Sequence, residues 1–557
     1  MSTTTTVPSQ AIATNQTTTA AATSQTTERH RAAAALNQVT ESQPSNEPYP
    51  TTALTLPELI AARAEDQAGR IALCVDGSRE LTFGEWLDRS RAVARGLIGL
   101  GVRPGDRVAL LFPEADWIEY AVGVLGIYLS GGAVVGLSPR LAADEIQRRL
   151  RHCGVRGLLY GPGAAPPAFA GWVWQLRDTA RSRGAVEPAV RPGDLAEIIY
   201  TSGTTGPAKP VAVTHANLTF GHDRATDKHG IHDRALRDRA AGVLAPAGPG
   251  ALTPVPPGTN AGHSALLVAL TGTSTVHVLT DQSARRVAEA LEQLPVGAAI
   301  LPAPLAVRLA ATGLLEGRDL SGLRAVMLGS TPVYGAVADY LRKLLPGAAL
   351  SVGYGSTEAA PASAHHPIPS TGPLGAPGVL GRMRPGSAAE VRGRDGAALP
   401  PGEVGEIWLR SPAPPRSYFA CADDDGADDD SAGNGTFRDG WTRMGDRGSI
   451  DHDAVLSFFS RSADALAVDG EPVSAFRVED ALLWHPDVTD AAVVQLPDGR
   501  LAAAVEVKDP AGPPDLRAHL AGRVARHEVP DLIVPVGSLP RGGLGKVLKR
   551  RLRESLT

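Results

Sequence analysis

The residues best suited to chemistry form a loop of hydroxyls and glycines that ends in a lysine. An apolar run at 198–200 leads into residues 201–209, which read TSGTTGPAK. Glycines leave backbone N–H groups accessible, Ser and Thr hydroxyls add donors, and a lysine adds positive charge, so such a loop can enclose an anion. It is not a Walker A pattern, because Lys209 has no glycine before it and no Ser or Thr after it. A plain surface turn is the alternative, but an apolar strand directly before the loop favours a polyphosphate site. The candidate residues are Thr201, Ser202, Gly203, Thr204, Thr205, Gly206 and Lys209.

Three later segments each contain one charged residue whose side chain is suited to bind a ligand or an ion. Residues 353–358 read GYGSTE, and the carboxylate of Glu358 suits a hard cation that also binds phosphate oxygens. Residues 441–446 read WTRMGD, and the carboxylate of Asp446 suits a pair of ribose hydroxyls. Residues 539–546 read LPRGGLGK, where a glycine-rich loop would let the Lys546 ammonium move into a site. Taken singly, these segments also fit a solvated glutamate, a turn-capping aspartate and a basic surface turn.

In their order along the chain, these segments resemble the motifs of the acyl-adenylating (AMP-binding) superfamily. That superfamily includes acyl- and aryl-CoA ligases, peptide-synthetase adenylation domains and luciferases. The loop at 201–209 is similar to its phosphate loop, TSG-[ST]-TG-x-PKG, with Ala208 in place of proline and Pro210 in place of glycine. Proline at 210 removes a backbone N–H beside the lysine. The resemblance extends over residues 54–557 and implies the fold and the first half-reaction, without specifying the acid.

The resemblance implies a role for each segment. Glu358 would help to hold Mg²⁺, Thr357 would contact a nucleotide phosphate, and Asp446 and Arg461 would bind the ribose. Lys546 would reach into the active site during adenylation. The implied catalytic residues are Thr201, Lys209, Glu358 and Lys546. The remaining implied nucleotide contacts are Gly329 and Ser330, in a pocket wall at 326–331, together with Gly353 and Tyr354.

Several positions depart from the superfamily's pattern near the start of its small domain. Met444 replaces the usual threonine before Asp446, and Ser460 replaces the glycine before Arg461. Ala463 occupies the hinge position, which is usually Asp or Lys, and an aspartate follows it. Gly470 matches the loop glycine that lines the thiol tunnel after the small domain rotates. The departures at 210, 460 and 463 favour a biosynthetic specialist.

The implied reaction is the attack of a substrate carboxylate on the α-phosphorus of ATP. Because two anions repel, catalysis would consist mostly of positioning and charge neutralisation. Pyrophosphate would leave, and the acyl-AMP would then pass its acyl group to a second nucleophile. Coenzyme A is the expected acceptor. A carrier-protein thiol, an amine and the activation of nitrite for diazotisation remain open.

The acid itself is not identified by the sequence. No aspartate lies in the segment 254–263 to hold an α-amino group, and Thr259 occupies the usual histidine position, so an ordinary α-amino acid is disfavoured. A non-catalytic regulator that binds nucleotide or acyl groups is an alternative of another class. The presence of Lys546 with Glu358 argues against it.

Composition excludes several other classes of protein. The 557 residues are 43% hydrophobic with a net charge of −5, which disfavours nucleic-acid binding as the main activity. Cys74, Cys153 and Cys421 form neither a metal pattern nor a disulfide framework, which fits a reducing compartment, so we expect a cytoplasmic protein. The uncharged stretch 120–137 is long enough to span a membrane. Its glycines instead predict a buried helix, a turn at 131–132 and a strand.

The remaining pattern predicts an α/β fold. Strand-like runs at 71–75, 108–112, 133–137 and 157–160 alternate with helical runs such as 84–100, and this alternation resumes from 197 to 352. Residues 162–192 and 242–262 are expected to be loops, and the aspartate run at 423–430 a solvated loop rather than a metal site. Strands at 491–496, 501–507 and 532–536 around a helix at 516–527 indicate a small α+β domain.

The expected organisation therefore has three parts. Residues 1–50 are predicted to be a disordered tail, because they carry almost no large apolar side chains. Residues 51–460 form a large domain of parallel and mixed sheets covered by helices. Residues 461–557 form a small mobile domain.

Overall fold

The computed structural model describes residues 54–179, 190–201, 208–220, 250–272, 274–420, 435–510, 514–542 and 545–557, together with Met1 and Gly512. Residues 54–557 belong to one compact unit. Four features singled out in the sequence lie outside the described residues. They are most of the N-terminal tail, residues 202–207 of the candidate phosphate loop, Cys421 and the aspartate run at 423–430.

One sheet positions the two ends of the candidate phosphate loop. Among the described residues it has seven strands in the order β18-β8-β7-β4-β3-β5-β6, with parallel pairing from β7 to β6. Strand β7 ends at Tyr200, and antiparallel β8 begins at Pro210, so the loop connects neighbouring strands. The strands are β3 (Arg107–Leu111), β4 (Ala133–Leu137), β5 (Gly157–Tyr160), β6 (Trp172–Gln175), β7 (Leu195–Tyr200), β8 (Pro210–Thr214) and β18 (Ser417–Tyr418).

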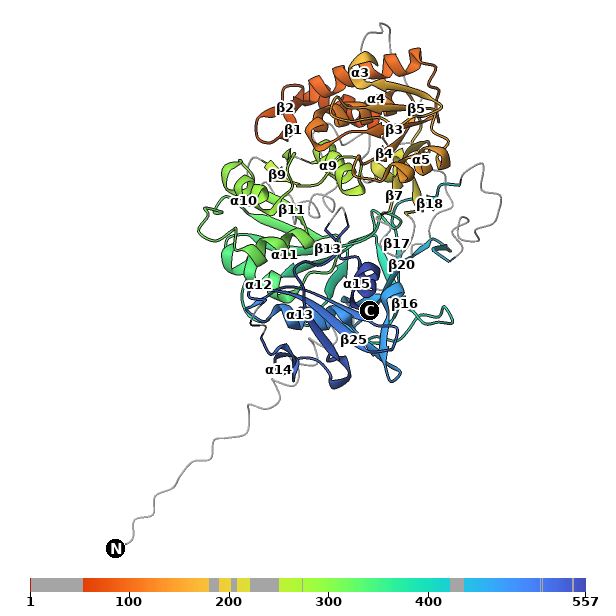
Figure 1. Ribbon diagram of the computed structural model, residues 1–557. Helices are drawn as coiled ribbons and strands as arrows, with labels where there is room; N and C mark the ends of the chain where they lie inside the picture. The colour runs from red at the N-terminus through yellow and green to blue at the C-terminus, as the bar shows by residue number, and fades with distance from the viewer. Residues whose placement is uncertain are drawn as a thin grey trace. The chain divides into compact units, whose positions relative to one another are not determined.

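The uncharged stretch folds as the sequence predicts. Helix α4 (Trp117–Leu129) is buried along its whole length, Gly131 turns the chain at φ 81°, and β4 follows. Nothing among the described helices combines the length and apolar character needed to cross a membrane. Helix α3 begins with a capping box between Thr82 and Glu85, and it packs beside α4 (Figure 1). The other helices around this sheet are α2 (Leu56–Gln67), α3 (Phe83–Gly99), α5 (Ala143–His152), α6 (Leu176–Thr179) and α7 (His215–Leu218).

A second sheet, of 14 strands among the described residues, has the order β16-β17-β20-β21-β15-β14-β13-β12-β11-β9-β10-β1-β2, with β19 paired to β20. Its neighbours from β1 through β13 are parallel, so the carboxyl ends of β12 and β13 share one edge. The parallel part comprises β1 (Ile71–Val75), β9 (Gly250–Leu252), β10 (Thr275–Val278), β11 (Ala298–Pro302), β12 (Ala325–Gly329) and β13 (Ala349–Tyr354). The antiparallel strands are β2 (Arg79–Thr82), β14 (Ala364–Ile368), β15 (Val379–Met383), β16 (Ala388–Arg392), β17 (Gly405–Arg410), β19 (Phe437–Arg438), β20 (Trp441–Ile450) and β21 (Leu456–Arg461).

Helices cover this second sheet and close the core. Buried aliphatic side chains of α10 (Ala284–Gln293), α11 (Ala303–Thr312) and α12 (Gly335–Leu344) pack on strands β11 to β13. A larger core joins both sheets through α2, α3, α4 and α9 (Asn260–Thr271). These helices therefore fix the phosphate-loop strands relative to the edge at which β12 and β13 end.

The small domain comprises the elements from β22 onward, drawn in blue in Figure 1. Its sheet has the order β24-β25-β26, and two of the hydrophobic cores are built from its own residues. The elements are β22 (Leu466–Val468), β23 (Glu471–Val473), α13 (Ala475–Leu483), β24 (Val488–Gln495), β25 (Leu501–Val507), α14 (Leu516–Leu520), β26 (Leu532–Pro535) and α15 (Lys549–Leu556). Short 3-10 turns lie at Glu114–Asp116, Ser462–Asp464 and Arg526–Glu528. The predicted fold class, α/β with a small C-terminal α+β domain, is confirmed.

Three local predictions were wrong. The helix expected at 516–527 ends at Leu520, because Gly522 adopts φ 77°, which a helix cannot continue through. The loop expected at 162–192 contains β6, which gains stability by pairing with β5. The loop expected at 242–262 contains β9 and the first turn of α9, and β9 is held between β10 and β11.

Candidate active site

Six of the predicted site residues lie at or just after the carboxyl ends of strands β12 and β13 of the second sheet. Gly329 closes β12, and Ser330 follows it with φ 73°, which is unusual for a residue that is not glycine. Gly353 and Tyr354 close β13, and Thr357 and Glu358 come directly after it. Ligands of open α/β sheets bind at the carboxyl ends of such strands.

Asp446 and Arg461 face each other on paired strands. They are register partners in the antiparallel pair β20–β21, and Arg461 Nε lies 2.9 Å from Asp446 Oδ1. The Tyr354 hydroxyl donates to Asp446 Oδ2 at 2.8 Å. Asp446 is only 3% exposed. Burial raises the pKa of Asp446, whereas Arg461, Tyr354 and Lys546 act in the opposite direction. The aspartate is therefore a buried acceptor held between an arginine and a tyrosine.

Lys546 joins this group from the small domain. Burial, with a further contribution from Arg461, lowers its pKa to about 8, even though Asp446 and Glu358 act in the opposite direction. The structure thus brings Lys546, Arg461, Asp446 and Glu358 within electrostatic reach of one another, although they come from four separate segments. Their charges offset one another in part, and a low local dielectric strengthens each interaction.

Backbone hydrogen bonds close the lysine loop on itself, and one glycine brings it against the large domain. Gly542 N donates to the Lys546 carbonyl at 2.9 Å, and Leu548 N donates to the Pro540 carbonyl at 2.8 Å. Gly545 has φ 78°, and a Cβ at this position would lie 3.2 Å from Pro304 Cβ at the start of α11. A glycine is therefore required here both by its backbone conformation and by the close approach of α11.

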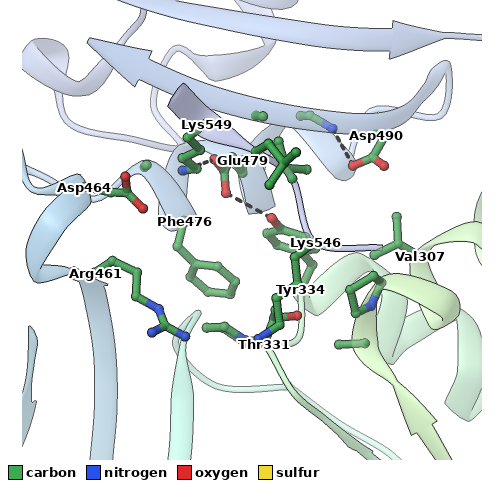
Figure 2. A pocket seen from close by; sticks show the side chains of 18 of the residues that line it. Val307, Thr331, Tyr334, Arg461, Asp464, Phe476, Glu479, Asp490, Lys546 and Lys549 are labelled. Carbon is green, nitrogen blue, oxygen red and sulfur yellow. Dashed lines mark hydrogen bonds and ion pairs between the residues drawn. The ribbon is translucent and has the colours of Figure 1, made fainter. Parts of the chain in front are cut away.

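A cavity of about 710 Å³ opens beside Lys546 (Figure 2). The large domain contributes Pro304, Val307 and Thr331 to its lining, while the small domain contributes Phe476 and Glu479. Its cationic lining residues include Arg461, Arg541, Lys546 and Lys549. The volume falls in the usual range for small-molecule sites, and three of these cations are already paired with carboxylates, Arg461 with Asp446, Arg541 with Asp490 and Lys549 with Glu479.

The two described ends of the phosphate loop are bonded to each other. Lys209 N donates to Thr201 Oγ1 at 3.1 Å, and Thr201 N donates to the Lys209 carbonyl at 3.0 Å. Lys209 Nζ lies 5.2 Å from the centre of the Tyr418 ring on β18. The structure therefore places Thr201 and Lys209 together at the base of the loop. That Lys209 shares a ligand with Glu358 remains a prediction.

Arg416 is a functional candidate that the sequence analysis missed. It is 8% exposed, and its Nη1 donates to the Thr357 carbonyl at 2.6 Å. Burial lowers its pKa to about 10, against the opposing charges of Glu197 and Glu358. Because Arg416 lies just before Tyr418, this short segment touches both the Lys209 side chain and the Glu358 segment. No motif marks it in the sequence, where it lies in a proline-rich run.

Glu197 on β7 lies at the centre of a second buried polar group. The Tyr128 hydroxyl donates to its Oε2 at 3.3 Å, and His263 Nδ1 lies 2.5 Å from the same oxygen. His215 lies nearby, with its ring 5.4 Å from that of Tyr128. Burial lowers the pKa of His215 to about 3, and its Nδ1 accepts a hydrogen bond from Leu56 N. His215 is therefore a neutral, bonded residue of the core.

Comparison with known proteins agrees with this arrangement. Residues 60–419 match the family model described as AMP-binding enzyme, and residues 477–546 match the one described as AMP-binding enzyme C-terminal domain. The large sheet-rich domain and the small domain define an adenylate-forming protein, an ATP-dependent ligase that produces AMP. The chain belongs to the AMP-binding enzyme family.

Individual relatives cover nearly the whole chain. The fatty acid–[acyl-carrier-protein] ligase ScoC of Streptomyces coeruleorubidus is 30% identical over 532 residues, covering 90% of this chain and 96% of that protein. A feruloyl-CoA synthase of an Amycolatopsis species is 31% identical over 494 residues, covering 86% and 94%. Among solved structures, the amide bond synthetase McbA from Marinactinospora thermotolerans is similar, with 26% identity, a TM-score of 0.71 and coverage of 90% and 100%.

The depressed pKa of Lys546 predicts a pH effect. The ammonium is the form that neutralises phosphate charge, and raising the pH through about 8 removes it from the free enzyme. We expect kcat/KM for ATP in pyrophosphate release to fall above that pH. In Lys546→Arg the guanidinium stays charged, so the fall should move to higher pH. An identical alkaline limb in both proteins would show that another group titrates.

The contacts of Arg416 predict a loss of activity when its charge is removed. Arg416→Met leaves Glu358 and Glu197 without this cation and the Thr357 carbonyl without its donor. We expect pyrophosphate release to fall by about 10- to 100-fold, the usual effect of losing a charged hydrogen bond. Arg416→Lys should be intermediate, and Arg382→Met, at an exposed position on β15, should match the wild type. Equal rates for Arg416→Met and Arg382→Met would remove Arg416 from the site.

Proposed function

We propose that this protein activates a carboxylic acid as acyl-AMP and then transfers the acyl group to a thiol, with coenzyme A as the acceptor. The observation that carries this proposal is the placement of the Lys546 ammonium against Asp446, Arg461 and Glu358. Lys546 of the small domain lines the cavity together with Arg461, and Arg461 pairs with Asp446, a buried carboxylate suited to a ribose. The lysine and the carboxylate are both required for adenylation and neither is required by the fold alone.

In the first half-reaction the chain's own residues would neutralise and orient two anions. Asp446 and Arg461 would hold the ribose, with the Tyr354 hydroxyl fixing the aspartate from the other side. Lys546 would offset negative charge on the phosphates as the substrate carboxylate approaches, and Lys209 would do so from the loop. Such preorganised charges are the main source of rate in phosphoryl-type transfers. Gly329, Ser330 and Gly353 would complete the nucleotide contacts.

The donor set around Glu358 fits a magnesium ion. Mg²⁺ prefers oxygen ligands and usually takes one or two protein carboxylates together with substrate phosphates and water. Glu358 supplies the carboxylate, and Arg416 holds the neighbouring carbonyl of Thr357 in place. When bound, Mg²⁺ would neutralise charge on the phosphate oxygens.

The second half-reaction would exchange one loop of the small domain for another. Gly470 lies in the turn between β22 and β23 with φ 84°, and no atom lies within 4 Å of a Cβ built there. This open backbone is suited to lining a narrow channel for a thiol. The chain enters the small domain through the turn Ser462–Asp464, which directly follows Arg461. The proposed boundary between residues 51–460 and 461–557 falls at the last residue of β21, directly before this turn, and Ala463 within the turn would be the pivot.

The choice of a thiol as the acceptor is supported by two relatives whose names mention a thiol acceptor. Feruloyl-CoA synthase points to coenzyme A, and the ScoC ligase points to a carrier protein. An amine is the second candidate, because the similar structure of McbA is that of an amide bond synthetase. The described cysteines, Cys74 and Cys153, are buried thiols, which supports a reducing compartment such as the cytoplasm.

A substitution at Lys546 tests the division between the two half-reactions. With an acid found by screening for pyrophosphate release, Lys546→Ala should lower adenylation by about 100-fold or more, the usual cost of one charge-stabilising donor. Transfer from supplied acyl-AMP to coenzyme A should change little. Equal losses in both steps would contradict the assignment of Lys546 to adenylation. No release from the wild type with any acid would contradict the proposed function itself.

A further inference from the structure

We infer that Tyr334 and Glu479 are positioning residues that dock the small domain for adenylation by joining the large-domain wall of the cavity to the segment that carries Lys546. This inference rests on the proposed function, since it concerns how Lys546 reaches its site. Tyr334 belongs to the large domain, in the segment that follows β12. Glu479 belongs to α13 of the small domain. Both lie at the cavity of Figure 2.

Glu479 connects three elements through one buried carboxylate. Its Oε2 accepts a hydrogen bond from the Tyr334 hydroxyl at 2.9 Å. Its Oε1 accepts from Lys549 Nζ at 2.7 Å and from Val493 N on β24 at 2.8 Å. Glu479 is 4% exposed, so these bonds are protected from water. Figure 2 shows the two side-chain bonds converging on Glu479 beside Lys546.

Lys549 carries this connection to the catalytic loop. It is the first residue of α15 and lies one turn after Lys546. The loop before it is fixed from the other side by the ion pair of Arg541 with Asp490 on β24. A displacement of Glu479 therefore moves the start of α15, and with it the anchor of the Lys546 loop.

The same face of α13 makes two further contacts with the Tyr334 segment. Phe476 stacks on the Tyr334 ring, with centroids 5.0 Å apart and planes 13° apart. Asp480 accepts a hydrogen bond from Gly335 N, the first residue of α12, at 2.5 Å. Phe476, Glu479 and Asp480 lie on one side of the helix, because residues three or four positions apart share a face. The docking contact is thus apolar at one turn and polar at the next.

The tyrosine hydroxyl is suited to act as a permanent donor. Burial and the Glu479 carboxylate raise the pKa of Tyr334 well above its usual value, so the hydroxyl keeps its proton at all working pH values. A hydrogen bond to a buried carboxylate is strong, and its loss leaves an acceptor unsatisfied. Rotation of the small domain for the second half-reaction would have to break this bond. It therefore favours adenylation and opposes premature rotation.

The experiment removes the hydroxyl and keeps the ring. Tyr334→Phe retains the stack on Phe476 but loses the donor to Glu479. In the full chain we expect the kcat of pyrophosphate release to fall by about 10-fold, the size of effect usual for such a bond. Transfer from supplied acyl-AMP should be unchanged or faster. The matched control is Tyr340→Phe, a half-buried tyrosine on α12, which should behave as the wild type.

Two measurements separate this role from general destabilisation. The double variant Tyr334→Phe/Glu479→Gln should lose less than the sum of the single losses, because both changes weaken the bond between these two side chains, while Glu479→Gln also weakens the pair with Lys549. Hydrogen exchange in the free enzyme should show faster exchange of the Gly335 amide in Tyr334→Phe than in Tyr340→Phe, with unchanged thermal unfolding. This second readout does not depend on any substrate.

Three results would contradict the positioning role of Tyr334 and Glu479. Equal losses in both half-reactions, additive losses in the double variant, or unchanged exchange at Gly335 would overturn the positioning role. If the wild type released no pyrophosphate with any acid, the proposed function would fail. The exchange measurement would still report whether the hydroxyl docks the small domain.

Discussion

The site depends on one buried cation. Lys546 is drawn out of water by the contact between the two domains, and burying an ammonium is unfavourable unless opposite charges lie near it. Asp446 and Glu358 provide those charges, while Arg461 works against them, which leaves the pKa of Lys546 near 8. A bound polyphosphate would remove the imbalance by adding negative charge. The buried positive charge that is unfavourable in the free protein would therefore be neutralised by the anionic ligand.

Docking of the small domain is what brings this cation to the carboxylates. Charges of the neighbouring residues act on Lys546 itself, while the Glu479 carboxylate bonds Tyr334 of one domain and Lys549, three residues after Lys546, of the other. A small number of side-chain contacts at this point would suit the proposed turning of the domain between two half-reactions. The large domain contributes a rigid edge, because β12 and β13 are parallel and end together beside Arg416 and Thr357.

Sequence patterns predicted the parts of this arrangement that are local. The strand before Thr201, the buried helix and turn at 120–137 and the GYGSTE segment all have signatures within a few residues. Arg416, Tyr334 and Glu479 were missed because their importance comes from partners far along the chain: Arg416 bonds Thr357, and Tyr334 bonds Glu479. Strand β6 was missed because only pairing with β5 makes it a strand. The helix predicted to run to 527 ends at Leu520, because Gly522 adopts a positive φ that the apolar pattern of the segment does not indicate.

The most direct test is a crystal structure of the full chain with ATP and Mg²⁺. The account predicts that the ribose hydroxyls bond Asp446, that the Lys546 ammonium contacts the phosphates, and that Glu358 and Lys209 approach the same ligand. A nucleotide bound with Asp446 still turned away from the ribose, or with Lys546 and Glu358 on separate ligands, would contradict the claim that one site gathers these residues.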